Sequence, residues 1–133
     1  MLTNPRRQTL RKTERLYEKK AIETLFDSPG TIGNAPIKLL WKAYEGKDKS
    51  PVKVAFTVPR RSFKRAVDRN LLKRRMREAY RKHKYILYGV VEERMKHYHL
   101  MYVYTAKDKV LYPEIESKIV LTLQRLADKS GGK

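Results

Sequence analysis

Basic side chains recur along one side of a predicted helix, in a pattern suited to binding phosphate. This cationic arc lies within one sector at about 100° per residue and comprises Arg69, Asn70, Lys73, Arg74, Arg77, Arg81 and Lys84. Cations four residues apart repel one another on an isolated helix, and a polyanion lying along the arc would relieve that repulsion. Arginine suits this role because its planar guanidinium group can donate two hydrogen bonds to one phosphate. The cationic arc therefore predicts a surface for phosphates.

An apolar seam on the other side of the same helix would hold it against a core. The seam falls within a narrow sector and consists of Asp68, Leu72, Met76, Ala79 and His83. We therefore expect a helix from about residue 64 to residue 85. Before it, residues 52–58 alternate between apolar and polar side chains, which predicts a half-buried strand. Pro59 ends that strand because proline has no N–H to donate.

The remaining pattern predicts a small α+β chain. The expected elements are a helix from about 18 to 26, a strand over 37–44, a polar turn over 46–51, a strand over 100–104 and a helix that starts near Pro113. Residues 90–96 show no clear pattern. Residues 1–12 have the composition of a flexible basic arm and residues 129–133 that of a flexible tail. Helices and strands in this order indicate one α+β domain.

Composition supports a nucleic-acid partner. The chain has 133 residues and a net charge of +18, and its estimated pI is 10.2. Residues 60–84 carry twelve basic and two acidic side chains, so the charge is concentrated on the predicted helix. The chain contains no cysteine, which excludes disulfides and thiolate metal sites. We see no transmembrane or signal segment, so we expect a cytoplasmic protein with no membrane partner.

The cationic helix and the stretches around it resemble the bacterial ribonuclease P protein subunit. The helix reads Ala66-Val67-x-Arg69-Asn70-x-x-Lys73-Arg74-x-x-Arg77-Glu78-x-Tyr80-Arg81, which is similar to the signature helix of that family. Residues 54–61 resemble the strand and basic pair that precede this helix, and residues 15–26 resemble the first helix. Residues 100–104 and 112–126 fit the last strand and the last helix. The resemblance covers most of the chain.

The resemblance implies an RNA-dependent endonuclease. In this family the protein pairs with a catalytic RNA, which cleaves the 5′ leader from precursor tRNA with Mg²⁺. It implies that this chain binds both RNAs, supplies no catalytic residue and binds no metal or cofactor itself; we expect no protein partner. For the fold it implies a single RNA-binding domain over residues 1–133, an α/β sandwich. This would have one four-stranded sheet and three helices in the order αβββαβα, with a left-handed crossover around the signature helix.

Carried onto this sequence, the resemblance assigns two groups of site residues. Contact with the catalytic RNA is expected at Arg69, Asn70, Lys73, Arg74, Arg77 and Arg81. The leader is expected in a cleft between the first helix and the sheet, at Ile22, Phe26, Leu39, Trp41, Arg60 and Arg61. Single-stranded RNA is held by stacking on exposed aromatic or apolar faces beside cations. From the sequence, Phe26 and Trp41 fit a buried core as well as they fit such a stack.

Four positions depart from the family pattern. Leu71 stands where the family usually has an arginine, so any specific contact from that position is absent. Ile22 replaces a common phenylalanine, which turns a stacking contact into a packing contact. Pro59 and Phe63 stand where small residues are usual.

Other interpretations rest on fewer residues. His97 and His99 would share a strand face, but no third metal ligand can be placed, and we interpret them as surface residues.

A structural RNA-binding protein of the ribosomal type would share the charge but lack the signature helix. A DNA-binding protein is a further alternative, because residues 70–76 superficially resemble a homeodomain recognition helix. That domain needs three helices, whereas residues 52–58 alternate like a strand.

Overall fold

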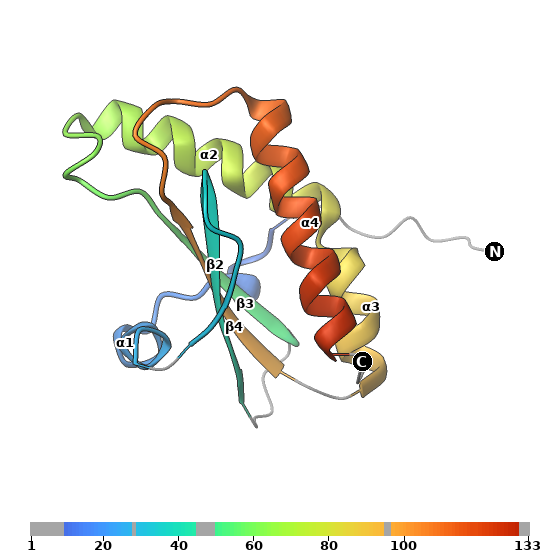
Figure 1. Cartoon of the computed structure of the whole chain (residues 1–133). Coiled ribbons are helices and arrows are strands. Elements are labelled where there is room, and N and C mark those ends of the chain that lie inside the picture. The colour runs from blue at the N-terminus through green and yellow to red at the C-terminus, as the bar shows by residue number, and fades with distance from the viewer. Residues whose placement is uncertain (1–9, 28, 45–49, 95–96, 131–133) are drawn as a thin grey trace.

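The computed structural model describes residues 10–27, 29–44, 50–94 and 97–130 and shows an α+β fold around one four-stranded sheet (Figure 1). Its elements are the 3₁₀ helix η1 (Lys12–Glu14), α1 (Lys19–Leu25), β1 (Gly30–Ile32), β2 (Ile37–Tyr44), β3 (Val52–Thr57), α2 (Ala66–His83), α3 (Tyr85–Arg94), β4 (His97–Tyr104) and α4 (Tyr112–Ser130). Within these ranges, no helix combines the length and the apolar character that a membrane span requires.

The sheet is mixed, with the strand order β1-β2-β4-β3. β1 pairs with β2 and β2 with β4 in antiparallel fashion, whereas β3 runs parallel to β4. Parallel neighbours need a long crossover connection, and here that connection contains α2 and α3. In the register, Ile37 pairs with Tyr104 and Tyr44 with His97, so β2 begins at the end of the sheet where β4 finishes.

The main core lies on the face of the sheet that we call the helix face, because α2, α3 and α4 cover it (Figure 1). The buried residues that the strands contribute are Ile32, Ile37, Leu39, Val52, Val54, Tyr98, Leu100, Tyr102 and Tyr104. Facing them, α2 contributes Leu72, Met76, Ala79 and Tyr80, and α4 contributes Ile115, Ile119, Leu123, Leu126 and Ala127. The seam that predicted an amphipathic helix is thus confirmed, since three of its residues are fully buried at Leu72, Met76 and Ala79.

The opposite face, called the α1 face, has a smaller cluster. Its buried members are Leu16, Leu25, Leu40 and Met101, and Ala21, Ile22, Ala55 and Val103 pack against them. Because successive side chains of a strand point to opposite faces, Lys38, Lys42 and Tyr44 lie on the α1 face with Leu40. Each of these three side chains is only partly buried. The α1 face therefore offers polar and aromatic surface beside one short helix.

Polar contacts fix α2 to α4 and to the loop that precedes α4. Lys109 Nζ lies 2.6 Å from the Asp68 carboxylate, and Arg75 donates a hydrogen bond of 2.8 Å to the carbonyl oxygen of Val110. At the other end of α2, His83 Nε2 lies 2.9 Å from the Glu116 carboxylate of α4. These contacts along the helix set its rotation, and with it the direction in which its remaining side chains point.

A buried ion pair ties the N-terminal segment to the end of α2. Lys84 is fully buried, and its Nζ lies 2.7 Å from Oε2 of Glu14, which is itself 6% exposed. Tyr88 donates a hydrogen bond of 2.9 Å to the same carboxylate and accepts one of 3.2 Å from Tyr80. Burial raises the pKa of the Tyr88 hydroxyl far above its ordinary value, so the group stays protonated as a donor.

The predicted number of helices is wrong. The described residues contain four α-helices in the order αβββααβα, whereas three were expected in the order αβββαβα. α2 ends at His83 and α3 begins at Tyr85, and the single residue between them, Lys84, keeps helical angles of φ −57° and ψ −27°. No glycine or proline marks this junction, so the sequence carries no sign of the break. The sequence pattern also did not predict where β1, a strand of three residues, would lie. β4 begins at His97, three residues before its predicted start, because it pairs with the whole of β2.

Two predicted flexible segments are partly ordered. Leu10 is 6% exposed within the main core, and Lys12 belongs to η1, so the last residues of the predicted arm over residues 1–12 are part of the fold. Lys129 and Ser130 belong to α4, and the Ser130 hydroxyl lies 2.9 Å from the Tyr98 hydroxyl. Residues 1–9 and 131–133 lie outside the described residues, as do residues 46–49 of the predicted turn.

We expect Lys84→Met to lower the free energy of unfolding by about 3–5 kcal/mol, because it leaves the Glu14 carboxylate buried without its partner. Urea unfolding followed by circular dichroism measures this change. The exposed neighbour Lys82 is the control, and Lys82→Met should cost less than about 1 kcal/mol. Adding Glu14→Gln to Lys84→Met should restore part of the loss. Equal effects of the two lysine variants would contradict a structural role for the buried pair.

Candidate nucleic-acid interface

Four residues of the cationic arc present polar groups that no other described residue engages. Asn70, Arg74 and Arg77 are exposed and Lys73 is half-buried. Within the part of the chain that the structure describes, none of the four forms a hydrogen bond or an ion pair through its side chain. Their spacing of three or four residues places them on one side of two helical turns. This group, called the open arc below, can donate to phosphates without breaking an internal contact.

Arg69 has a structural role that its spacing did not reveal. Its Nη1 donates hydrogen bonds of 2.8 Å to the carbonyl oxygens of Phe63 and Lys64, in the loop that precedes α2. These two hydrogen bonds join the first turn of α2 to the loop that precedes it. Arg69 therefore fixes the entry into α2, and a variant of Arg69 would test this loop as well as ligand binding.

Arg81 and Lys84 are also engaged within the protein. Arg81 Nη2 lies 2.6 Å from the Glu78 carboxylate, and its Nε donates to the same group. The hydrogen bond from Arg81 lowers the pKa of the Glu78 carboxyl below its ordinary value, so the pair is charged at neutral pH. Lys84 is buried on Glu14, so its predicted place in the cationic arc is wrong. The helical wheel placed these residues by angle alone and could not show their partners.

The departure at Leu71 produces an apolar edge beside the open arc. Leu71 is half-buried, and Val67, one turn before it, is 60% exposed. Arg75, one turn after it, is engaged with Val110 and therefore does not extend the open arc. The open arc is thus bordered on this flank by two aliphatic side chains.

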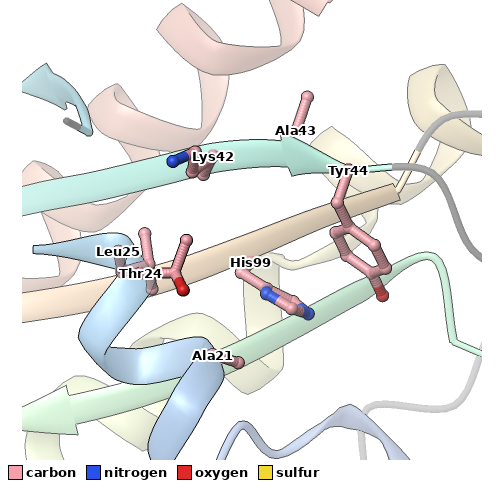
Figure 2. A pocket seen from close by; sticks show the side chains of 7 residues that line it. All are labelled: Ala21, Thr24, Leu25, Lys42, Ala43, Tyr44 and His99. Atoms are coloured by element: carbon pink, nitrogen blue, oxygen red, sulfur yellow. The ribbon is translucent and has the colours of Figure 1, made fainter. Parts of the chain in front are cut away.

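A pocket of about 190 Å³ lies between α1 and the α1 face of the sheet (Figure 2). Ala21, Thr24 and Leu25 line its helix side, and Lys42, Ala43, Tyr44 and His99 line its strand side. The ring centroids of Tyr44 and His99 are 4.0 Å apart with an interplanar angle of 36°. Lys42 has no ion-pair partner among the described residues. The α1 pocket combines an apolar wall, an aromatic pair and a cation.

Two residues predicted to contact a leader in this cleft lie on the wrong face. Leu39 is fully buried in the main core, and Trp41 packs against the same core with its ring 5.7 Å from that of Tyr98. Both therefore belong to the helix face, whereas the α1 pocket lies on the α1 face. The alternation of β2 was correctly predicted, but the set of residues that faces α1 is Lys38, Leu40 and Lys42.

The other predicted leader contacts are dispersed. Ile22 packs against the small cluster beneath α1, and Phe26, just after α1, is 56% exposed. Arg60 and Arg61 are exposed in the turn after β3. That turn lies at the end of the sheet where Thr57 pairs with Val103, away from the α1 pocket at Lys42 and His99. The structure brings Ile22 and Phe26 near the pocket but not this arginine pair.

The sequence interpretation missed Lys42, Tyr44 and His99. Lys42 and Tyr44 fall on the polar side of the predicted strand over 37–44, and this alternation was the signal that could have found them. His99 was interpreted as a surface residue; in the sheet it pairs with Lys42 on one side and Lys53 on the other, and its side chain lines the pocket. Among the described residues, no group of three His, Cys, Asp or Glu side chains could hold a metal ion.

Known proteins resemble this chain in sequence and in fold. A sequence model of the family described as Ribonuclease P matches residues 10–127. The ribonuclease P protein component of Porphyromonas gingivalis is 28% identical over 126 residues, which cover 95% of this chain and 92% of that protein. The ribonuclease P protein component of Chlorobaculum tepidum is 40% identical over 90 residues, which cover 65% of this chain and 58% of that protein.

Solved structures share the fold. The ribonuclease P protein of Thermotoga maritima has a TM-score of 0.66 at 20% identity and covers 84% of this chain and 96% of its own. The ribonuclease P protein of Staphylococcus aureus has a TM-score of 0.63 at 16% identity and covers 86% of this chain and 94% of its own. The family match spans most of the chain, and the solved structures share its fold. The chain belongs to the ribonuclease P protein family.

Proposed function

We propose that this chain, as the protein component of a ribonuclease P holoenzyme, uses the open arc of α2 to bind the catalytic RNA and the α1 pocket to bind the 5′ leader of precursor tRNA. The observation that carries the proposal is the set of four donors on α2 that have no partner among the described residues. The endonucleolytic step belongs to the RNA in this family. The protein therefore contributes binding and positioning, in the bacterial cytoplasm, with Mg²⁺ supplied to the RNA-containing holoenzyme.

Three features favour the open arc as the docking surface for folded RNA. Its residues belong to a helix whose rotation is fixed by the Asp68–Lys109 ion pair and by Arg75, so the donors are held in place before RNA arrives. Arginine can form two bonds with one phosphate, which suits Arg74 and Arg77. Asn70 can both donate and accept, so it can bind a ribose hydroxyl.

The α1 pocket has the chemistry of a site for single-stranded RNA. Bases in single strands stack on aromatic rings while cations follow the phosphates. The Tyr44 and His99 rings provide such a stacking surface, and Lys42 lies on the same strand as Tyr44. Phe26 adds an exposed aromatic ring just after α1. These residues replace Leu39 and Trp41 as the proposed leader contacts.

The family match does not favour the alternative of a ribosomal-type RNA-binding protein. The hand of the crossover from β3 to β4 stays a prediction from the resemblance, as does the absence of a metal or protein partner of the polypeptide itself.

Replacing Arg74 and Arg77 together by alanine should weaken binding to the catalytic RNA and reduce its salt dependence. Because each phosphate contact adds about 0.7–0.9 to the slope of log K against log salt, the slope should become shallower by about 1.5. Filter binding over a range of salt concentrations measures it. The control is the pair Lys107→Ala and Lys129→Ala, which removes the same charge from exposed positions elsewhere. Equal changes in the two double variants would contradict a specific docking surface.

Tyr44→Ala should weaken holoenzyme binding to precursor tRNA by about tenfold and leave binding to mature tRNA unchanged, because only the precursor has a leader to stack on the ring. Leu111→Ala is the control, since Leu111 is exposed at the start of α4 on the other side of the sheet. The comparison uses reconstituted holoenzyme and fluorescent RNAs. If Tyr44→Ala weakened both RNAs equally, the α1 pocket would not be the leader site.

A further inference from the structure

A second cavity, of about 380 Å³, lies between the turn after β1 and α4, away from both surfaces described so far. The residues that matter for its chemistry are Gly33, Asn34 and Ile37 on the turn side and Lys118, Leu121 and Arg125 on α4. Its volume is within the range of about 300–1,000 Å³ that small-ligand pockets have. We call it the α4 cavity.

The turn side of the α4 cavity is held in place by the backbone. The Thr105 hydroxyl donates to the carbonyl oxygen of Asn34, and the Thr105 N–H donates to that of Pro36 at 2.7 Å. Gly33 has a φ of +83°, and a β-carbon there would lie 3.0 Å from the carbonyl oxygen of Ile37. Glycine therefore permits the turn and leaves no side chain in the space beside α4.

The helix side of the α4 cavity joins an apolar patch to two cations. Leu121 is 38% exposed and lines the cavity on the side of α4 that faces away from the main core. Lys118 and Arg125 flank it, two turns apart, about 10.5 Å along the axis. Neither cation has an ion-pair partner in the described ranges, although Glu114 and Asp128 lie within one turn of them on α4. The two charges are thus not neutralised inside the protein.

The register of the sheet relates the α4 cavity to the other surfaces. Ile37 pairs with Tyr104, and β3 ends beside Val103, so the cavity and the start of α2 lie at the same end of the sheet. The α1 pocket lies at the opposite end and on the opposite face, where Lys42 pairs with His99. In Figure 1, the turn after β1 lies at the α2 end of the molecule, with α4 beside it. A ligand of the α4 cavity is therefore closer to the RNA bound by α2 than to the leader.

We propose that the α4 cavity binds one unpaired nucleotide of the catalytic RNA, with its base against Leu121 and the Arg125 guanidinium plane and its phosphate on Lys118. An aliphatic floor, a stacking guanidinium and a free ammonium group are the combination that holds an unstacked nucleotide. The net charge of +18 favours a polyanion over any neutral occupant. This inference rests on the proposed function, since it assumes that the catalytic RNA is the partner of α2.

The test compares two double variants of the full chain: Lys118→Ala with Arg125→Ala, and the control Lys107→Ala with Lys129→Ala. Each is mixed with the catalytic RNA alone, and the dissociation constant is measured over a range of salt concentrations. The cavity variant should bind about tenfold more weakly than the control, with a slope shallower by about 0.7–0.9, because only Lys118 is placed on a phosphate. Holoenzyme assembled at saturating protein should bind precursor tRNA as the wild-type holoenzyme does.

A second comparison tests the apolar floor. Leu121→Glu places a carboxylate in the cavity, whereas Gln124→Glu adds the same charge at an exposed position of α4 outside it. Only Leu121→Glu should weaken binding to the catalytic RNA, and neither should change the midpoint of urea unfolding, because both side chains are exposed.

Other results would overturn the inference and leave the proposed function intact. If the cavity variants matched their controls while Arg74→Ala with Arg77→Ala still weakened binding, the α4 cavity would not bind this RNA; a site for a protein partner would give this result. If only binding to precursor tRNA fell, the occupant would be the substrate. If wild-type protein itself failed to bind the catalytic RNA, the proposed function would fail first.

Discussion

The parallel pairing of β3 with β4 is the constraint on which the rest of the structure depends. Two parallel neighbours cannot be joined by a tight turn, so the chain between them must cross a face of the sheet. The crossing segment contains α2, and α4 packs beside it to close the main core. The helix face is then filled, and only the short α1 remains for the other face. Both proposed RNA surfaces follow from this division.

The sequence predicted the elements better than the faces they present. The strand over 37–44 has the predicted bounds, and its alternation was predicted correctly. Both of its sides are partly apolar, however, with Leu39 and Trp41 on one side and Leu40 on the other. The alternation divides the side chains of β2 into two sets, one on each face of the sheet. It does not show which set enters the core, because packing against α2 and α4 decides that. The leader residues were therefore assigned to the wrong side of a correctly predicted strand.

The cationic arc shows a second limit of sequence patterns. Spacing along a helix predicted the direction of each side chain, and the open arc agrees with it. It could not show that Arg69 has carbonyl acceptors in the loop before α2, that Glu78 engages Arg81, or that Lys84 meets a carboxylate seventy residues earlier in the chain. These partners come from turns and from long-range packing, which a helical wheel does not contain. A count of charges therefore overstates the surface available to RNA.

The two proposed RNA surfaces lie near opposite ends of β2, so the length of this strand sets the distance between them. The α1 pocket is beside its last residues, and α2 starts near its first, on the other face of the sheet. A strand of eight residues spans about 22–24 Å from its first Cα to its last, and hydrogen bonds to β4 along its whole length keep that span rigid. In the proposed arrangement, the length of one strand fixes how far the single-stranded end of the substrate lies from the folded RNA that cuts it.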